Sequence, residues 1–77
     1  MKRDNSRHHS TFKILGKNIR DRREFLRISQ EELAFLVSST RNYIGCIERA
    51  EKYPSLAFVL DIANALKTNI KDLFSNI

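Results

Sequence analysis

Residues 29–50 read SQEELAFLVSSTRNYIGCIERA, and this stretch decides the fold of the 77-residue chain. Ser29 followed by Glu32 forms a capping box, in which the hydroxyl and the carboxylate each accept a hydrogen bond from the other residue's backbone amide. A short helix is therefore expected to begin after Ser29 and to end near Val37. Thr40 is a second capping residue, so another helix is expected to follow it directly.

This second helix is expected to run from Arg41 to about Ala50, with Ile44 and Ile47 pointing toward a core. Only the polar residues 38–40 separate it from the helix before. Two short helices joined in this way have the dimensions of a helix-turn-helix unit, in which the second helix enters the major groove of DNA. The pattern therefore favours a DNA-reading motif.

Helical patterning continues on both sides of this unit. The chain has only two glycines and one proline, and it lacks the period-two alternation of a half-buried strand, so we predict an all-α fold. The predicted elements are a flexible N-terminal tail (1–10), a helix from about Phe12 to Leu26, the two short helices, a helix from about Leu56 to Leu66 capped by Ser55, and a short helix capped by Asn69. Residues 11–77 are predicted to form one five-helix domain.

Composition excludes several classes of protein. The longest apolar runs, 33–37 and 56–60, are far shorter than the roughly 20 residues that cross a bilayer. The first residues carry no apolar stretch of the kind found in a secretory signal, so a cytoplasmic protein is expected. Cys46 is the single cysteine. Metal-ligand spacing, a Gly-rich phosphate loop and a nucleophile elbow are all missing from the sequence, so we expect no cofactor, no metal and no catalysis.

The positive charge is concentrated in the first half of the chain. The net charge is +5, and residues 11–27 hold six basic side chains against two acidic ones, whereas residues 54–77 are balanced. A basic half joined to a neutral, apolar half indicates a polyanion on one side and a protein partner on the other. A basic surface that is merely solvated is the alternative.

Two charged residues lie on apolar helix faces. Arg23 falls on the apolar stripe of the first helix, and Glu48 follows Ile44 by one turn on the third. Each would cost several kcal/mol if it were buried alone. We therefore predict that Arg23 and Glu48 form a structural ion pair and that the first helix packs on the third.

The fourth helix carries an apolar arc wider than a small core can cover. Leu56, Val59, Leu60 and Ala63 share one face, and further apolar residues extend the arc into the last helix. An uncovered apolar face is typical of a homodimer. The residues predicted at this interface are Phe58, Ile62, Leu66, Ile70, Leu73, Phe74 and Ile77. Alternatively, the last helix folds back and covers the whole arc.

From Leu15 to Phe74 the chain resembles the Xre-like family of helix-turn-helix domains, which includes the lambdoid phage repressors and Cro. The matching pieces are Gly16-x-x-Ile19-Arg20-x-x-Arg23, Ser29-Gln30-Glu31-Glu32-Leu33-Ala34, Tyr43-Ile44-x-x-Ile47-Glu48-Arg49, and Pro54-Ser55-Leu56 with Ala65-Leu66 and Asp72-Leu73-Phe74. Within that family it most resembles the controller proteins of restriction-modification systems. The resemblance implies a compact five-helix repressor-like fold and a transcriptional regulator that binds a palindromic operator as a homodimer.

The chain also departs from the family pattern. Family members commonly have glycine at the positions of Arg27, Ser38 and Ala50. Because a side chain disfavours positive φ, we expect some of these helix ends to be reshaped. Arg22 stands where an apolar residue is usual, so its stem is expected to pack while its head reaches solvent or phosphate.

The side chains expected at DNA project from the third helix and its surroundings. Arg41 suits bidentate contact with guanine and Asn42 with adenine, whereas Tyr43 could equally serve packing. Gly45 is expected to let the protein backbone approach DNA closely. Cys46 is expected to make a weak contact with DNA or none. Gln30 is expected to anchor a phosphate, as in the family. The full predicted set is Arg20, Gln30, Thr40, Arg41, Asn42, Tyr43, Gly45, Cys46, Arg49 and Lys52.

Two other functions fit the same sequence. An antitoxin-type interaction module would cover a protein partner with its apolar fourth and fifth helices, and a non-specific DNA coat would bind every duplex alike. In phage-type relatives acidic residues on the second helix can touch RNA polymerase, which makes Glu31 and Glu32 candidates for an activating contact.

Overall fold

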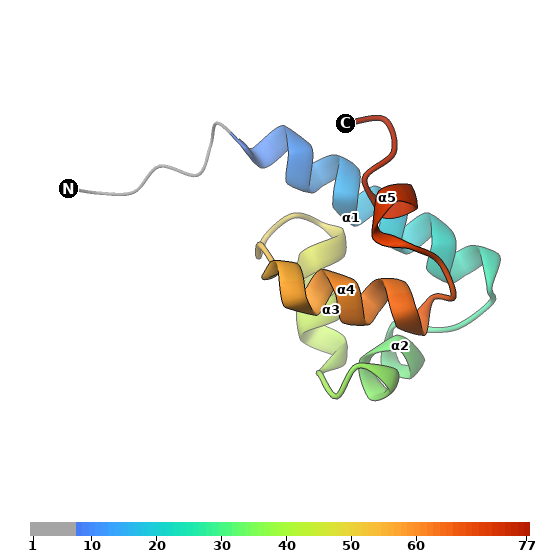
Figure 1. Cartoon of the computed structure of the whole chain (residues 1–77). Helices are drawn as coiled ribbons and strands as arrows, with labels where there is room; N and C mark the ends of the chain where they lie inside the picture. Colours follow the sequence, from blue (N-terminus) through green and yellow to red (C-terminus); the bar gives the residue numbers. More distant parts are fainter. Residues whose placement is uncertain (1–7) are drawn as a thin grey trace.

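The computed structural model describes residues 8–77, and within that range every regular element is a helix. The five helices are α1 (His9–Phe25), α2 (Gln30–Leu36), α3 (Arg41–Glu48), α4 (Leu56–Ala65) and α5 (Ile70–Leu73) (Figure 1). Helix α1 packs against α3 and α5, and α2 packs against α3 and α4. This confirms the predicted all-α, five-helix fold. No helix between residues 8 and 77 is long and apolar enough to cross a membrane.

Four of the five helices begin at a capping side chain. The capping box before α2 is complete, because the Ser29 hydroxyl accepts from the Glu32 amide and the Glu32 carboxylate accepts from the Ser29 amide. At α3, α4 and α5, the side chains of Thr40, Ser55 and Asn69 each accept a hydrogen bond from a backbone amide in the first turn, without the reciprocal bond of a capping box. These four starts agree with the sequence prediction.

Helix α1 begins at His9, three residues earlier than its apolar pattern indicated. Its first turn is held from outside the helix: His9 Nδ1 lies 2.8 Å from the Tyr53 hydroxyl, and the Phe12 ring stacks on Tyr53 at 4.2 Å. Because Tyr53 lies 44 residues from His9 in the chain, the sequence around His9 gives no sign that the helix begins there. Residues 1–7 of the predicted tail lie outside the described residues.

The expectation that helix ends are reshaped is wrong. Arg27, Ser38 and Ala50 all adopt left-handed backbone conformations, with φ of 59°, 55° and 58°. At each, the residue's own backbone amide and the next one close a Schellman motif, for example Ser38 N to Phe35 O at 3.2 Å and Ser39 N to Ala34 O at 2.8 Å. Lys67 ends α4 in the same way. The satisfied carbonyls offset a strain of about 1–2 kcal/mol per residue.

The hydrophobic core contains buried side chains from each of the five helices. Its largest fully buried residues are Leu15, Ile19, Leu33, Ile44, Ile47, Val59, Ile62, Leu66 and Leu73. Gly16 permits a close contact between two helices, because a Cβ there would lie 2.5 Å from the Ile47 carbonyl oxygen and 2.6 Å from that of Glu48. Helices α1 and α3 therefore touch backbone to backbone.

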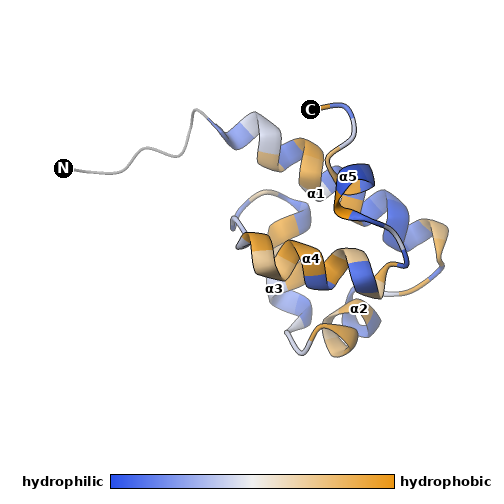
Figure 2. Cartoon of the chain, in the orientation of Figure 1, coloured by the Kyte–Doolittle hydropathy of each residue, from blue (hydrophilic) through white to orange (hydrophobic). Residues whose placement is uncertain are grey.

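The structure corrects the predicted faces of α4, which is apolar along most of its length (Figure 2). Leu56 and Leu60, placed on one face with Val59 and Ala63, are 64% and 49% exposed, whereas Val59 and Ala63 are buried. Ile62, Leu66 and Leu73, assigned to a dimer interface, are instead buried in the monomer's own core. The apolar arc of α4 is wider than the face that the core covers, so a helical wheel does not show which part of the arc is buried. Of the other predicted interface residues, Phe58, Ile70 and Phe74 are half-buried and Ile77 is exposed.

Polar side chains of α1 hold the ends of the last two helices. Arg22 donates to the carbonyls of Leu66 and Lys67 at 2.9 and 3.0 Å, and its guanidinium lies over the Phe25 ring. The Arg22 head thus closes the C-terminus of α4 while it remains partly exposed, a contact that the sequence did not indicate. Asn18 similarly donates to carbonyls at the end of α5.

Candidate nucleic-acid interface

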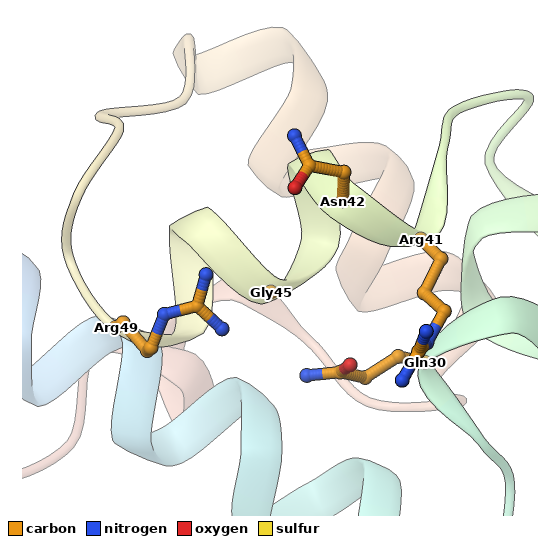
Figure 3. A pocket seen from close by; sticks show the side chains of 5 residues that line it. All are labelled: Gln30, Arg41, Asn42, Gly45 and Arg49. Carbon is orange, nitrogen blue, oxygen red and sulfur yellow. The ribbon is translucent and has the colours of Figure 1, made fainter.

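Five predicted DNA-facing residues line one shared hollow with a volume of about 420 Å³. Gln30 comes from the start of α2, whereas Arg41, Asn42 and Gly45 come from α3 and Arg49 from its C-cap. Figure 3 shows Arg41 and Arg49 at the two ends of α3, with the Gln30 side chain extending between them. The capping of both helices places these groups, since Ser29 and Thr40 fix where each helix begins.

A second hollow of about 510 Å³ adjoins the first and adds the basic side of α1. Lys13, Lys17 and Arg20 line it together with Glu48 and Arg49. Arg49 lines both hollows, so it stands where the basic residues of α1 meet α3. Guanidinium, ammonium and carboxamide groups on one surface can donate to phosphates and to the edges of bases.

Several of these cations already have a carboxylate partner. Lys17 pairs with Asp21 at 2.7 Å and Arg20 with Glu24 at 3.5 Å, both one helical turn apart and exposed. Such surface pairs contribute about 0–1 kcal/mol, so a phosphate can replace the carboxylate at little cost. Arg41 is exposed and has no ion-pair partner within residues 8–77.

A buried hydrogen-bond network supports this surface from behind. Arg23 of α1 donates to both carboxylate oxygens of Glu48, Nε to Oε2 at 2.7 Å and Nη2 to Oε1 at 3.2 Å. Hydrogen bonding to Glu48 raises the pKa of Arg23. The Gln30 carboxamide also donates to Glu48 Oε1, at 3.0 Å. Sequence reasoning missed this last bond, because spacing along the chain gives no sign that α2 and α3 share a carboxylate.

The structure separates the predicted contact residues by exposure. The exposed ones are Arg20, Thr40, Arg41, Asn42, Arg49 and Lys52; Gln30, Tyr43 and Cys46 are half-buried, and Gly45 is buried. The Thr40 hydroxyl caps α3, and the Tyr43 ring packs edge-on against Phe58 at 5.4 Å. These two side chains therefore have structural contacts of their own.

The absence of a side chain at Gly45 first makes room for the protein's own Arg49. A Cβ at Gly45 would lie 3.0 Å from Arg49 Nη1. The free thiol of Cys46 lies beside the same guanidinium, with Sγ 4.0 Å from Nη2. Over the described range 8–77, no cluster of three or more His, Cys, Asp or Glu side chains is arranged to hold a metal ion.

A model of the helix-turn-helix family matches residues 19–73, which contain the whole of α2 and α3. The chain belongs to the helix-turn-helix family. Control protein C.SmaI of Serratia marcescens is 37% identical over 62 residues, covering 80% of this chain and 74% of that protein. The alignment confirms the resemblance to controller proteins found in the sequence.

Two solved helix-turn-helix structures share the architecture. The restriction-modification controller protein C.AhdI from Aeromonas hydrophila matches with a TM-score of 0.83 and 36% identity, over 87% of this chain and 97% of that one. The P22 c2 repressor, solved in complex with a synthetic operator, matches with a TM-score of 0.74 and 30% identity, over 82% and 96%. The chain is thus a helix-turn-helix DNA-binding regulator that resembles controller proteins and a phage repressor.

Proposed function

We propose that the protein binds a palindromic operator in double-stranded DNA as a homodimer and controls transcription there. The observation that carries this proposal is the hollow that Gln30, Arg41, Asn42, Gly45 and Arg49 share across α2 and α3. A dimer would present two such surfaces to half-sites roughly 34 Å apart, one turn of B-DNA. It would act in the cytoplasm, by binding and without catalysis.

Base reading is assigned to the start of α3. Arg41 is exposed and unpaired within the described part of the chain, so both nitrogens of its fork are available to guanine O6 and N7. Asn42, its exposed neighbour, suits adenine N6 and N7. Pairings of this kind discriminate between bases by about 1–3 kcal/mol each.

Phosphate contacts are assigned to the residues around α3. Arg20 and Lys52 are exposed cations, and such contacts set register and affinity without reading sequence. Gln30 gives one N–H to Glu48 and keeps its second N–H and its carbonyl oxygen for DNA. We place Thr40, Tyr43 and Cys46 at the edge of the DNA-binding surface, where they contribute little to binding.

We place the proposed dimer interface on the outer face of α4. Leu56 and Leu60 lie one helical turn apart, and both remain largely exposed in the monomer. Of the residues first assigned to the interface, Ile77 is exposed and Phe58, Ile70 and Phe74 are half-buried, so they can border this face. Burial of these apolar side chains by a second copy would stabilise the dimer.

A groove on α2 favours an additional contact with RNA polymerase. Ile28, Glu31, Glu32, Phe35 and Leu36 line a hollow of about 290 Å³, and Phe35 is 84% exposed. An apolar groove bordered by two carboxylates suits a partner that presents an apolar side chain flanked by basic ones. The protein would then activate as well as occlude a promoter.

Selection of bound duplexes from a random library tests the main proposal. At about 0.15 M salt, which suppresses much non-specific binding, we expect enrichment of an inverted repeat. Equal recovery of all duplexes by a folded protein would indicate a non-specific DNA coat. Failure to bind any duplex, together with co-purification of a second polypeptide, would indicate the antitoxin-type module.

A further inference from the structure

Arg49, which lines both hollows, is held by a side-on ion pair with Glu51. Arg49 Nε lies 3.0 Å from Glu51 Oε2, and Nη2 lies 3.1 Å from Oε1. The Schellman motif at the end of α3 builds this pair, because the left-handed Ala50 turns the chain and the Glu51 amide bonds back to the Cys46 carbonyl at 2.8 Å. The carboxylate therefore returns alongside the guanidinium that precedes it by two residues.

The third nitrogen of this guanidinium points elsewhere. Arg49 Nη1 lies at Gly45, 3.0 Å from the place that a Cβ would occupy, and Gln30 Nε2 lies 3.6 Å from the same place. Within residues 8–77 no hydrogen-bond partner is found for Nη1. The pair thus leaves one end of the guanidinium open to the hollow between Gln30 and α3.

We infer that Glu51 is a positioning residue that makes Arg49 a selective DNA contact, with Gly45 providing the space in which the guanidinium lies. This rests on the proposed operator binding. Glu51 acts in two ways. It weakens the attraction of Arg49 to any phosphate, which lowers affinity for random DNA, and it holds the guanidinium in one orientation before binding, so that less side-chain entropy is lost at the correct site.

The ionisation of the pair agrees with this geometry. The hydrogen bonds between the two side chains raise the pKa of Arg49 and lower the pKa of Glu51. A carboxylate with a lowered pKa keeps its charge as the pH falls below the usual range for glutamate. The carboxylate that pairs with Arg49 therefore stays charged across neutral and mildly acidic conditions.

Two variants test the inference in the full-length protein. Glu51→Gln removes the charge, and Gly45→Ala displaces the guanidinium while leaving net charge unchanged. Asp72→Asn, on α5 and away from both hollows, is the matched control for loss of one negative charge. Affinities for the selected operator and for a random duplex are measured over a salt series, and the ratio of the two gives the specificity.

For Glu51→Gln we expect a specificity ratio at least about five-fold lower than wild type, with a salt slope on random DNA steeper by about 0.9. Gly45→Ala should lower the ratio without steepening the slope. Asp72→Asn should change neither. If Glu51→Gln and Asp72→Asn alter both affinities to the same extent, Glu51 is only one charge among others and the inference is overturned.

A measurement without DNA separates this inference from the proposed function. The Arg49 Nε–H signal in nitrogen-15 NMR should exchange slowly with water in the wild type and rapidly in Glu51→Gln. Rapid exchange in the wild type would overturn the positioning role even if the operator is bound selectively. Slow exchange together with equal affinity for all duplexes would support the positioning of Arg49 by Glu51 but would contradict the proposed recognition of an operator.

Discussion

Arg23 and Glu48, 25 residues apart in sequence, form a two-point ion pair that is about nine-tenths buried on both sides. The pair joins α1 to α3 at the place where Gln30 also reaches the carboxylate. One glutamate therefore links three helices directly behind the hollow that we propose faces DNA.

Removal of one partner from this pair should be costly. Glu48→Ala leaves the Arg23 guanidinium buried with one remaining bond to the Ile28 carbonyl, and we expect a loss of about 3–5 kcal/mol in the free energy of unfolding. The double variant Arg23→Met, Glu48→Met should be considerably more stable than Glu48→Ala, since it buries no unpaired charge. Urea titrations measure both, and an unchanged midpoint for Glu48→Ala would refute the coupling.

Glycine at a left-handed helix end should stabilise the protein. Ser38 has a φ of 55° and an exposed side chain, so Ser38→Gly should relieve strain and raise the free energy of unfolding by about 1 kcal/mol. The control is Ala57→Gly on the exposed side of α4, which should lower it by about 0.5–1 kcal/mol. Thermal melts that show a loss in both variants would contradict the strain argument.

The two glycines should respond differently to alanine. Gly16→Ala places a methyl group against the carbonyls of Ile47 and Glu48, so α1 must move and we expect a loss of about 1–3 kcal/mol or more. Gly45→Ala meets only the end of a flexible side chain, and the unfolding midpoint should stay the same or rise. Equal effects of the two changes would argue against backbone contact between α1 and α3.

Arg41→Ala should separate base reading from charge. Loss of a bidentate guanine contact should weaken operator binding by about 1–3 kcal/mol, with a much smaller effect on random duplexes. Lys71→Ala on α5 is the control for removal of one positive charge. Fluorescence anisotropy measures both affinities, and an equal loss on the two duplexes would make Arg41 a phosphate contact.

Leu60→Glu should produce monomers. The side chain is 49% exposed in the monomer, so a charge there should disturb a dimer without disturbing the core. Phe35→Glu is the control, because Phe35 is more exposed and lies on α2. Sedimentation equilibrium should show a dimer for the control and a monomer for Leu60→Glu, whereas a dimer in both would place the interface elsewhere.

Local sequence signals determined the helices of this protein and the motif they form. Ser29 with Glu32, Thr40, Ser55 and Asn69 mark four helix starts, and capping depends only on residues within one turn. A charged residue on an apolar helix face also predicts an ion pair, because burial of an unpaired ion is so costly that a partner is required. That reasoning led from Arg23 to Glu48.

Contacts between distant residues decided the rest. The apolar arc of α4 is too wide to show which side faces the core, so packing against the other helices buried Ile62 and left Leu60 outside. The bond from Gln30 to Glu48 likewise depends on how α2 and α3 are oriented. Periodicity along a chain sets the side chains on a helix, but the rotation of that helix about its axis is set only by the surfaces it packs against.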